Sequence, residues 1–182
     1  MSAKYSFQLR SSTGRQDFPH KIILGQREIE TPVQVLLKLL GYLLFFRERL
    51  QIEPRLDLDT IPFVPDLVEL DYGLRPVLWV ECGECTVTKL DRLAVKVPDA
   101  ALWVLKRSPA AAELLWQLMA KHELRRRRYR LIGFDAEMFD EVLATLQARN
   151  EVLWVRGSFD PAELQFDFNG LWFEASYQIL EF

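Results

Sequence analysis

Two acidic residues, Asp66 and Glu81, have the type and spacing of a metal-binding pair. Asp66 begins an extended run, and Glu81 lies near the end of the apolar run 76–82. If the turn at residues 72–74 folds these runs into a hairpin, the two carboxylates meet at one sheet edge. Carboxylates that share a half-buried site repel each other and lose hydration, and a cation removes that cost. Oxygen ligands suit Mg²⁺, so we predict a magnesium site with the Cys82 carbonyl as a third protein ligand.

A lysine follows at a position from which it could assist chemistry at this site. Residues 88–91 read as the capped start of a helix, which places Lys89 in its first turn. A cation there opposes the helix dipole by roughly 0.3–1 kcal/mol, whereas the free N–H groups of that turn favour a phosphate. We predict that Lys89 assists an attacking water or steadies negative charge on phosphorus, beside Asp66 and Glu81. The alternative is a lysine that lies in solvent and takes no part in chemistry.

Positive charge is concentrated in the segment 121–130. It carries six basic residues and one acid, whereas the whole chain has a net charge of −3. Such a segment predicts local binding of DNA or RNA phosphates. The residues expected to make these contacts are Arg125, Arg126, Arg127 and Arg128. The alternative is a solvated helix end that runs into a strand.

The two cysteines, Cys82 and Cys85, do not indicate a metal or redox centre. The two histidines, His20 and His122, lie far away without ligand-like spacing, so a structural zinc site is not expected. A redox pair would need the helix to begin between the cysteines, and the helix signals come later. We expect one buried thiol and one thiol in a loop.

The hydrophobic pattern predicts an α/β fold with a mixed central sheet and flanking helices. The predicted strands are 4–9, 21–24, 66–71, 76–82, 100–105, 129–134, 152–155, 164–168 and 171–176. The predicted helices are 32–46, 88–97, 109–122 and 136–148, and the segment 47–60 reads as irregular. The strands 76–82 and 100–105 flank a helix, which predicts a parallel right-handed crossover. Neither a linker nor an internal repeat is apparent, so residues 1–182 are expected to form one domain.

Local signals fix several of these boundaries. Thr31, Pro32 and Gln34 combine an N-cap, a proline at the first helical position and a capping box. The helix 32–46 is apolar around most of its circumference, so we expect it to lie deep against a sheet. Residues 169–170 are Asn-Gly, a strong signal for a two-residue hairpin turn.

Composition places the chain among globular proteins. Hydrophobic residues make up 49% and charged residues 27% of the sequence. The longest apolar stretch, 36–46, falls short of the ~20 residues that a membrane span needs. The start of the chain lacks the layout of a signal peptide, so the expected location is the cytoplasm.

Four segments are similar to the YaeQ family of bacterial proteins, namely 36–43, 48–51, 78–83 and 101–103. The order of elements over about residues 31–105 also resembles the PD-(D/E)XK nuclease superfamily. This resemblance implies a restriction-endonuclease-like core with β-hairpin additions at both termini, and metal-ligand roles for Asp66 and Glu81. Gly83 occupies the place of the motif's lysine, so the resemblance moves that role to Lys89, with Arg92 as an alternate.

Two functional hypotheses follow. The first is a Mg²⁺-dependent nuclease, or a degenerate relative that binds nucleic acid without cutting it. The second is a non-catalytic scaffold whose C-terminal hairpin presents exposed aromatic residues to a protein partner. The residues expected on that surface are Trp172, Phe173, Tyr177 and Phe182. Acids that lie close together in an open cleft would favour the nuclease, and acids closed by a salt bridge to Arg92 or Lys96 would favour the scaffold.

Overall fold

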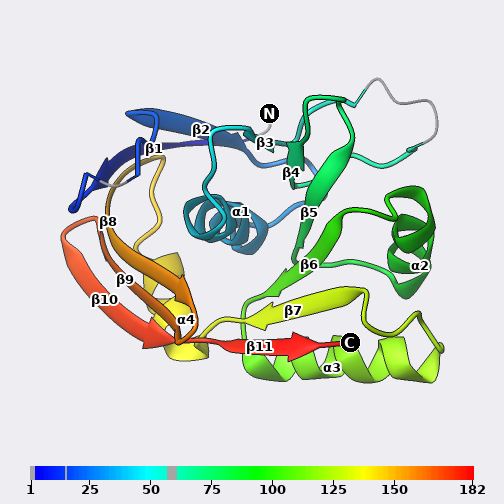
Figure 1. Ribbon diagram of the computed structural model, residues 1–182. Helices are drawn as coiled ribbons and strands as arrows, with labels where there is room; N and C mark the ends of the chain where they lie inside the picture. Colours follow the sequence, from blue (N-terminus) through cyan, green and yellow to red (C-terminus); the bar gives the residue numbers. More distant parts are fainter. Residues whose placement is uncertain (1–2, 15, 57–60) are drawn as a thin grey trace.

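Two β-sheets lie on either side of one buried helix (Figure 1). The computed structural model describes residues 3–14, 16–56 and 61–182. The first sheet, sheet A, contains in spatial order β10 (Leu171–Ser176), β9 (Ala162–Phe168), β8 (Arg149–Phe159), β1 (Lys4–Ser11) and β2 (Lys21–Gly25). The second, sheet B, contains β11 (Gln178–Glu181), β7 (Tyr129–Gly133), β6 (Ala101–Lys106), β5 (Pro76–Cys82), β4 (Leu67–Leu70) and β3 (Leu50–Ile52). Both sheets are mixed, but the prediction of a single central sheet was wrong.

The buried helix explains why a second sheet is needed. Helix α1 (Pro32–Leu44) begins as predicted, and the Thr31 backbone N–H donates to Gln34 Oε1 at 2.7 Å. Every residue from 35 to 44 is buried. A helix that is apolar on all sides must be covered on all sides. The hydrophobic core around α1 includes Trp154 of sheet A and Val80 of sheet B. Neither α1 nor any other helix in the described ranges has the length and apolarity needed to span a membrane.

The outer face of sheet B carries the second core. Helices α2 (Val87–Lys96) and α3 (Pro109–Lys121) cover this face, where Trp79, Leu93 and Met119 are buried. Strands β5, β6 and β7 are parallel, which confirms the predicted crossover. Helix α4 (Ala136–Ala144) joins the inner core and ends four residues earlier than predicted.

Two short strands were not predicted. Strand β3 lies in the segment 47–60, which had been interpreted as irregular, and residues 57–60 of that segment lie outside the described residues. Strand β11 pairs antiparallel with β7 and returns the chain from sheet A to sheet B. The three predicted hairpins are confirmed, β1 with β2, β4 with β5 and β9 with β10. Asn169 and Gly170 form the turn of the second hairpin, with φ of 52° and 84°.

The aromatic residues near the C-terminus are not the exposed surface that was predicted. Phe173, Tyr177 and Phe182 are buried, and only Trp172 is exposed, at 54%. The reason is β11, which places Phe182 in the outer core of sheet B. The expected protein-binding surface is therefore reduced to one large aromatic residue.

Candidate functional site

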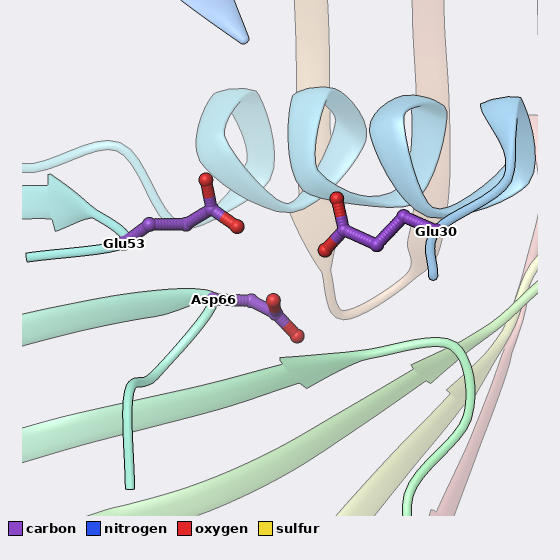
Figure 2. Close-up of side chains that lie close together, drawn as sticks. All are labelled: Glu30, Glu53 and Asp66. Carbon is purple, nitrogen blue, oxygen red and sulfur yellow. The ribbon is translucent and has the colours of Figure 1, made fainter. Parts of the chain in front are cut away.

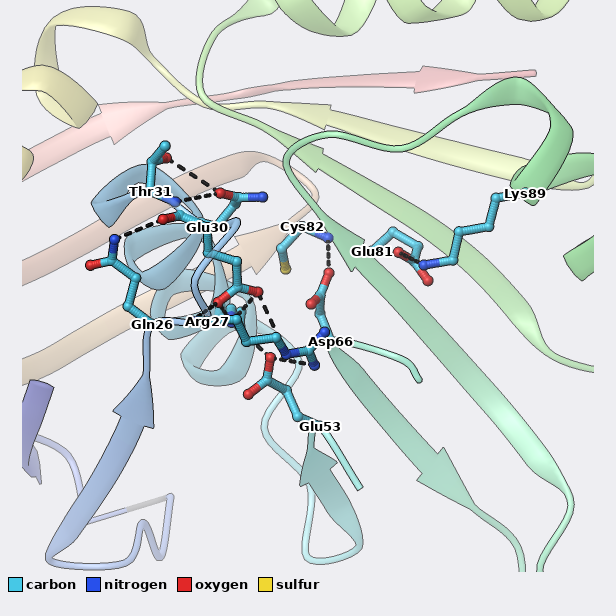
Figure 3. Close-up of polar contacts among 11 residues, drawn as sticks. Gln26, Arg27, Glu30, Thr31, Glu53, Asp66, Glu81, Cys82 and Lys89 are labelled. Atoms are coloured by element: carbon cyan, nitrogen blue, oxygen red, sulfur yellow. Dashed lines mark hydrogen bonds and ion pairs between the residues drawn. The ribbon is translucent and has the colours of Figure 1, made fainter. Parts of the chain in front are cut away.

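The β4–β5 hairpin brings Asp66 and Glu81 to the same end of sheet B. Leu67 pairs with Val80, so the residues that precede and follow them, Asp66 and Glu81, face each other across the hairpin. Asp66 Oδ2 accepts a hydrogen bond of 2.7 Å from the Cys82 backbone N–H, which holds the carboxylate against the end of β5 (Figure 3). The predicted hairpin that places both acids at one end of the sheet is thus present in the structure.

Glu81 is buried and its two oxygens are engaged. Its residue exposure is 3%, and Trp79 Nε1 donates to one carboxylate oxygen at 2.8 Å. Lys89 Nζ donates to the other at 2.6 Å. The predicted catalytic lysine is therefore the partner of Glu81, in place of the Lys96 or Arg92 pairing that was considered as an alternative.

Helix α2 positions Lys89, although the cap differs from the prediction. The N-cap is Thr86, whose Oγ1 accepts from the Lys89 backbone N–H at 3.1 Å. Thr88 and Asp91 already lie inside the helix. The predicted cap at Thr88 was therefore wrong, because the helix begins about half a turn earlier. Lys89 still belongs to the first turn, and its side chain reaches back over the end of β5.

Three carboxylates gather beside α1, and two of them were not predicted as site residues (Figure 2). Oxygens of Glu30, Glu53 and Asp66 all lie within 4.8 Å of one another. Glu30 directly precedes the cap of α1, and Glu53 follows β3. Asp66 therefore lies between Glu30 and Glu53, on the α1 side of the sheet, and Glu81 at the end of β5.

A buried lysine neutralises part of this charge. Lys38 is fully buried in α1, and its Nζ lies 2.8 and 2.9 Å from the Glu30 oxygens and 2.8 Å from Glu53 Oε1. Burial acts to lower the pKa of Lys38, but the hydrogen bonds and charges of Glu30 and Glu53 outweigh it and raise the pKa. Arg27 adds a second cation, 2.7 Å from Glu53 Oε1. The sequence signal for the buried carboxylates Glu30 and Glu53 was Lys38 itself, the single lysine inside the apolar stretch 36–46.

The surroundings of Asp66 raise its pKa. Four carboxylates of this end of the sheet (Glu30, Glu53, Asp66 and Glu81) lie among the cations of Arg27, Lys38 and Lys89, and the buried Lys106 lies close by. Burial and the charge of Glu81 raise the pKa of Asp66 to about 7, against the opposing effects of the Cys82 N–H and the two lysines. Within the described part of the chain, its second oxygen accepts no hydrogen bond. Asp66 is therefore the carboxylate at which a proton or another cation is best accommodated.

The backbone explains why Gly83 cannot be the motif's lysine. Gly83 has a φ of +86°, and a Cβ at this position would lie 2.8 Å from Gln34 Cγ. Gln34 is itself held by the capping box of α1. A buried lysine from the next strand, Lys106, instead donates to the Gly83 carbonyl at 2.6 Å, and burial lowers its pKa. A lysine side chain that acts here must therefore come from another element.

The two cysteines are protonated thiols. Both are free; Cys82 is buried in the inner core and Cys85 is partly buried. Burial raises the pKa of Cys82 well above its usual range and the pKa of Cys85 to about 12. Because thiolate is the reactive form, this environment opposes redox chemistry. The role of the Cys82 backbone carbonyl as a ligand of a metal ion stays a prediction.

The arginine run lies at the other end of the parallel strands. Arg128 donates to the carbonyls of Val97 and Ala100 in the connection before β6, whereas Glu81 and Cys82 pair with Val104 and Leu105 near the end of β6. Arg126 packs over the Phe182 ring at 4.1 Å, and Arg125 and Arg127 are exposed. The structure therefore separates these arginines from the acids by the length of a strand.

Comparisons with known proteins identify the family. The family model described as YaeQ protein matches residues 4–155. The crystal structure of a YaeQ protein from Xanthomonas axonopodis pv. citri superposes with a TM-score of 0.69 at 22% identity, covering 99% of this chain and 97% of that one. A YaeQ protein from Pseudomonas syringae gives a TM-score of 0.72 at 16% identity, covering 100% and 97%. No curated protein matches. The match of the family model over most of the chain, together with the shared fold, shows that this chain belongs to the YaeQ family.

Proposed function

We propose that this chain is a Mg²⁺-dependent phosphodiesterase that acts on nucleic acid, built on a restriction-endonuclease-like core of the PD-(D/E)XK type over about residues 31–105. The observation that carries the proposal is the arrangement of Asp66, Glu81 and Lys89. Asp66 and Glu81 lie at opposed positions at one end of the β4–β5 hairpin, and the Lys89 ammonium lies 2.6 Å from the Glu81 carboxylate. These are the residue types that metal-assisted phosphoryl transfer requires.

The types of donor atom suit a magnesium ion. Asp66 and Glu81 supply carboxylate oxygens, the Cys82 carbonyl supplies a third, and Mg²⁺ prefers such ligands. The clustered carboxylates at this end of the sheet and the raised pKa of Asp66 favour a cation. A bound ion would polarise a phosphate and lower the pKa of a bound water.

Each residue of the chain has a separate task in this scheme. Asp66 must release its proton before it can act as a ligand, because neutral carboxyl groups bind cations weakly. Lys89 is held by the Thr86-capped turn and by Glu81, from where its ammonium can stabilise negative charge that develops on phosphorus. Glu30 and Glu53 remain paired with Lys38 and take no direct part in this scheme.

Titration calorimetry with Mg²⁺ and Mn²⁺ tests the metal site. We expect the wild type to bind the ion with release of a proton at pH 7, and Asp66→Asn to bind it at least tenfold more weakly without loss of the fold. Lys89→Met should retain metal binding but lose cleavage of single-stranded and duplex DNA and RNA. The matched control is Lys96→Met, an exposed lysine of the same helix. A wild type that binds neither ion would overturn the enzymatic proposal, and binding without cleavage would identify the degenerate form.

A second candidate function is the non-catalytic scaffold, and one observation favours it. Glu81 is closed from solvent, with both oxygens bonded within the chain. In a scaffold these bonds would be structural, and the exposed Trp172 would contribute to a protein surface. The two candidates differ in calorimetry, because only the enzyme and its degenerate form bind a divalent ion.

A further inference from the structure

A trough lies at the amino-terminal ends of the parallel strands, away from the acids. It consists of two adjoining cavities of about 790 and 480 Å³. They share the lining residues Ala101, Trp103, Arg130 and Glu181. Ala101 is the first residue of β6, and the start of β5 and of β7 lie level with it. The trough therefore belongs to a part of the sheet that the proposed metal site does not use.

Arginines line the trough at both ends. Arg126 and Arg127 border the first cavity, and Arg47 borders the second. Arg47 is paired with Glu69 at 2.9 Å, and Arg130 with Glu181 at 3.3 Å. Arg127 is exposed and forms no ion pair or hydrogen bond within the described ranges, and its φ of 60° holds its backbone in the left-handed region. The local surplus of positive charge selects an anionic ligand.

Aromatic rings lie beside the arginine side chains of the trough. The Arg126 guanidinium lies 4.1 Å from the centre of the Phe182 ring, and the Arg130 guanidinium lies 5.4 Å from that of Trp103. Phe159 forms a wall of the second cavity and is 38% exposed, although it packs against Trp103 at 5.4 Å. Guanidinium planes and aromatic rings are the surfaces on which unpaired bases stack. The trough thus combines phosphate-binding cations with stacking surfaces.

We propose that this trough binds single-stranded nucleic acid, with phosphates on Arg127 and Arg47 and a base against Phe159. A strand fits better than a duplex, because the bases of a duplex are paired and cannot reach an apolar wall. It fits better than an acidic peptide, because carboxylate side chains offer no ring to stack on Phe159. The binding needs neither a metal ion nor Asp66, so it goes beyond the proposed phosphodiesterase and stands independently of it.

Fluorescence anisotropy in EDTA tests the trough with labelled oligo(U) and oligo(dT) of about 12 nucleotides, a length typical of single-strand grooves. Arg127→Ala should weaken binding about three- to tenfold and reduce the slope of log affinity against log salt by about 0.7. Phe159→Leu keeps an apolar side chain but removes the ring, and should weaken binding at least about fivefold. The matched control is Lys121→Ala, an exposed cation of α3 that does not line either cavity and should leave the affinity unchanged.

Four results would overturn this inference. They are no binding of either oligonucleotide at low salt, an equal loss in Arg127→Ala and Lys121→Ala, equal affinity for a blunt duplex, and equally effective competition by poly-glutamate. Oligonucleotide binding is measured in EDTA, without the ion that the proposed phosphodiesterase requires. Loss of metal binding in calorimetry would therefore leave this inference standing, and loss of oligonucleotide binding would leave the phosphodiesterase standing.

Discussion

At the scale of single residues, ionisation of the Asp66 carboxyl group lowers the stability of the folded chain. Its carboxyl group keeps a proton up to a pH of about 7 in the folded chain, but loses it near its ordinary value of 3.8 when unfolded. The folded chain therefore holds one more proton between these values, and the free energy of unfolding falls as the pH rises from about 4 to about 7. This loss is complete about one pH unit above 7.

Asp66→Asn should consequently stabilise the metal-free chain in alkaline solution. Asparagine cannot ionise, and its carbonyl can still accept from the Cys82 N–H. We expect a gain of roughly 3–5 kcal/mol at pH 8 and a difference close to zero at pH 4. Urea unfolding at both pH values, followed by circular dichroism, measures it. A variant that is less stable than the wild type at pH 8 would contradict the raised pKa.

Lys38 should behave in the opposite way, because it neutralises buried carboxylates. Lys38→Met keeps the length of the side chain but leaves Glu30 and Glu53 without their buried cation. We expect a loss of roughly 3–5 kcal/mol in the free energy of unfolding. Denaturant unfolding measures it, with the exposed Lys96→Met as control. A loss equal to that of the control would mean that the Lys38 contacts contribute nothing.

The sequence predicted only part of this site, and the chain connectivity explains which part. Asp66, Glu81 and Lys89 come together through one hairpin and the next helix, both of which have local signals. Glu30 and Glu53 reach Asp66 only after α1 and β3 dock on sheet B, and no local pattern specifies that docking. The warning sign was Lys38, since a lysine at a buried position of an apolar helix requires acidic partners.

At the scale of elements, the start of α2 sets the position of the lysine. Thr86 caps the N–H of Lys89 itself, so Thr86→Ala removes a hydrogen bond from the residue that contacts Glu81. We expect a loss of about 1 kcal/mol in stability, together with a lower rate of the proposed cleavage at unchanged affinity for the proposed Mg²⁺ ion. The control is Ser108→Ala, which removes the same kind of cap from α3, where Ser108 Oγ accepts from Ala111. Equal effects of both variants on the rate would show that the cap of α2 has no special role.

Elements with strong local signals were predicted well, and those defined by their partners were not. The capping box at Thr31 and the Asn-Gly turn at 169–170 depend on neighbouring residues, so the sequence shows them directly. Strands β3 and β11 are three and four residues long and exist through pairing with β4 and β7. Segments this short carry too little alternation to be recognised as strands.

At the scale of the whole molecule, the C-terminal segment ties the two sheets together. Phe182 packs against Trp116 and Tyr129 in the outer core, whereas Trp172 lies exposed on sheet A. Phe182→Ala should therefore cost roughly 2–4 kcal/mol, and Trp172→Ala less than about 1 kcal/mol. Thermal and urea unfolding of the two variants compare them directly. Equal losses would contradict the burial of Phe182.

The division into two sheets could not have been predicted from the pattern alone. Strand β1 pairs in parallel with β8, from Ser6 opposite Arg149 to Ser11 opposite Trp154. The sequence contains the strands but not the choice of partner, because every apolar strand competes for the same edges. What favours the second sheet is the remaining apolar surface of α1, a property that only the assembled fold makes visible.

The pairing of β1 with β8 also dictates an order of events during synthesis. A chain that leaves the ribosome amino end first presents β1 and β2 long before β8 exists, and a two-stranded hairpin is marginally stable by itself. Strands β4 to β7 and the helices between them can meanwhile assemble from nearby segments. One flank of α1 must then wait uncovered until β8 emerges, which makes this flank the surface that a chaperone would have to shield in the nascent polypeptide.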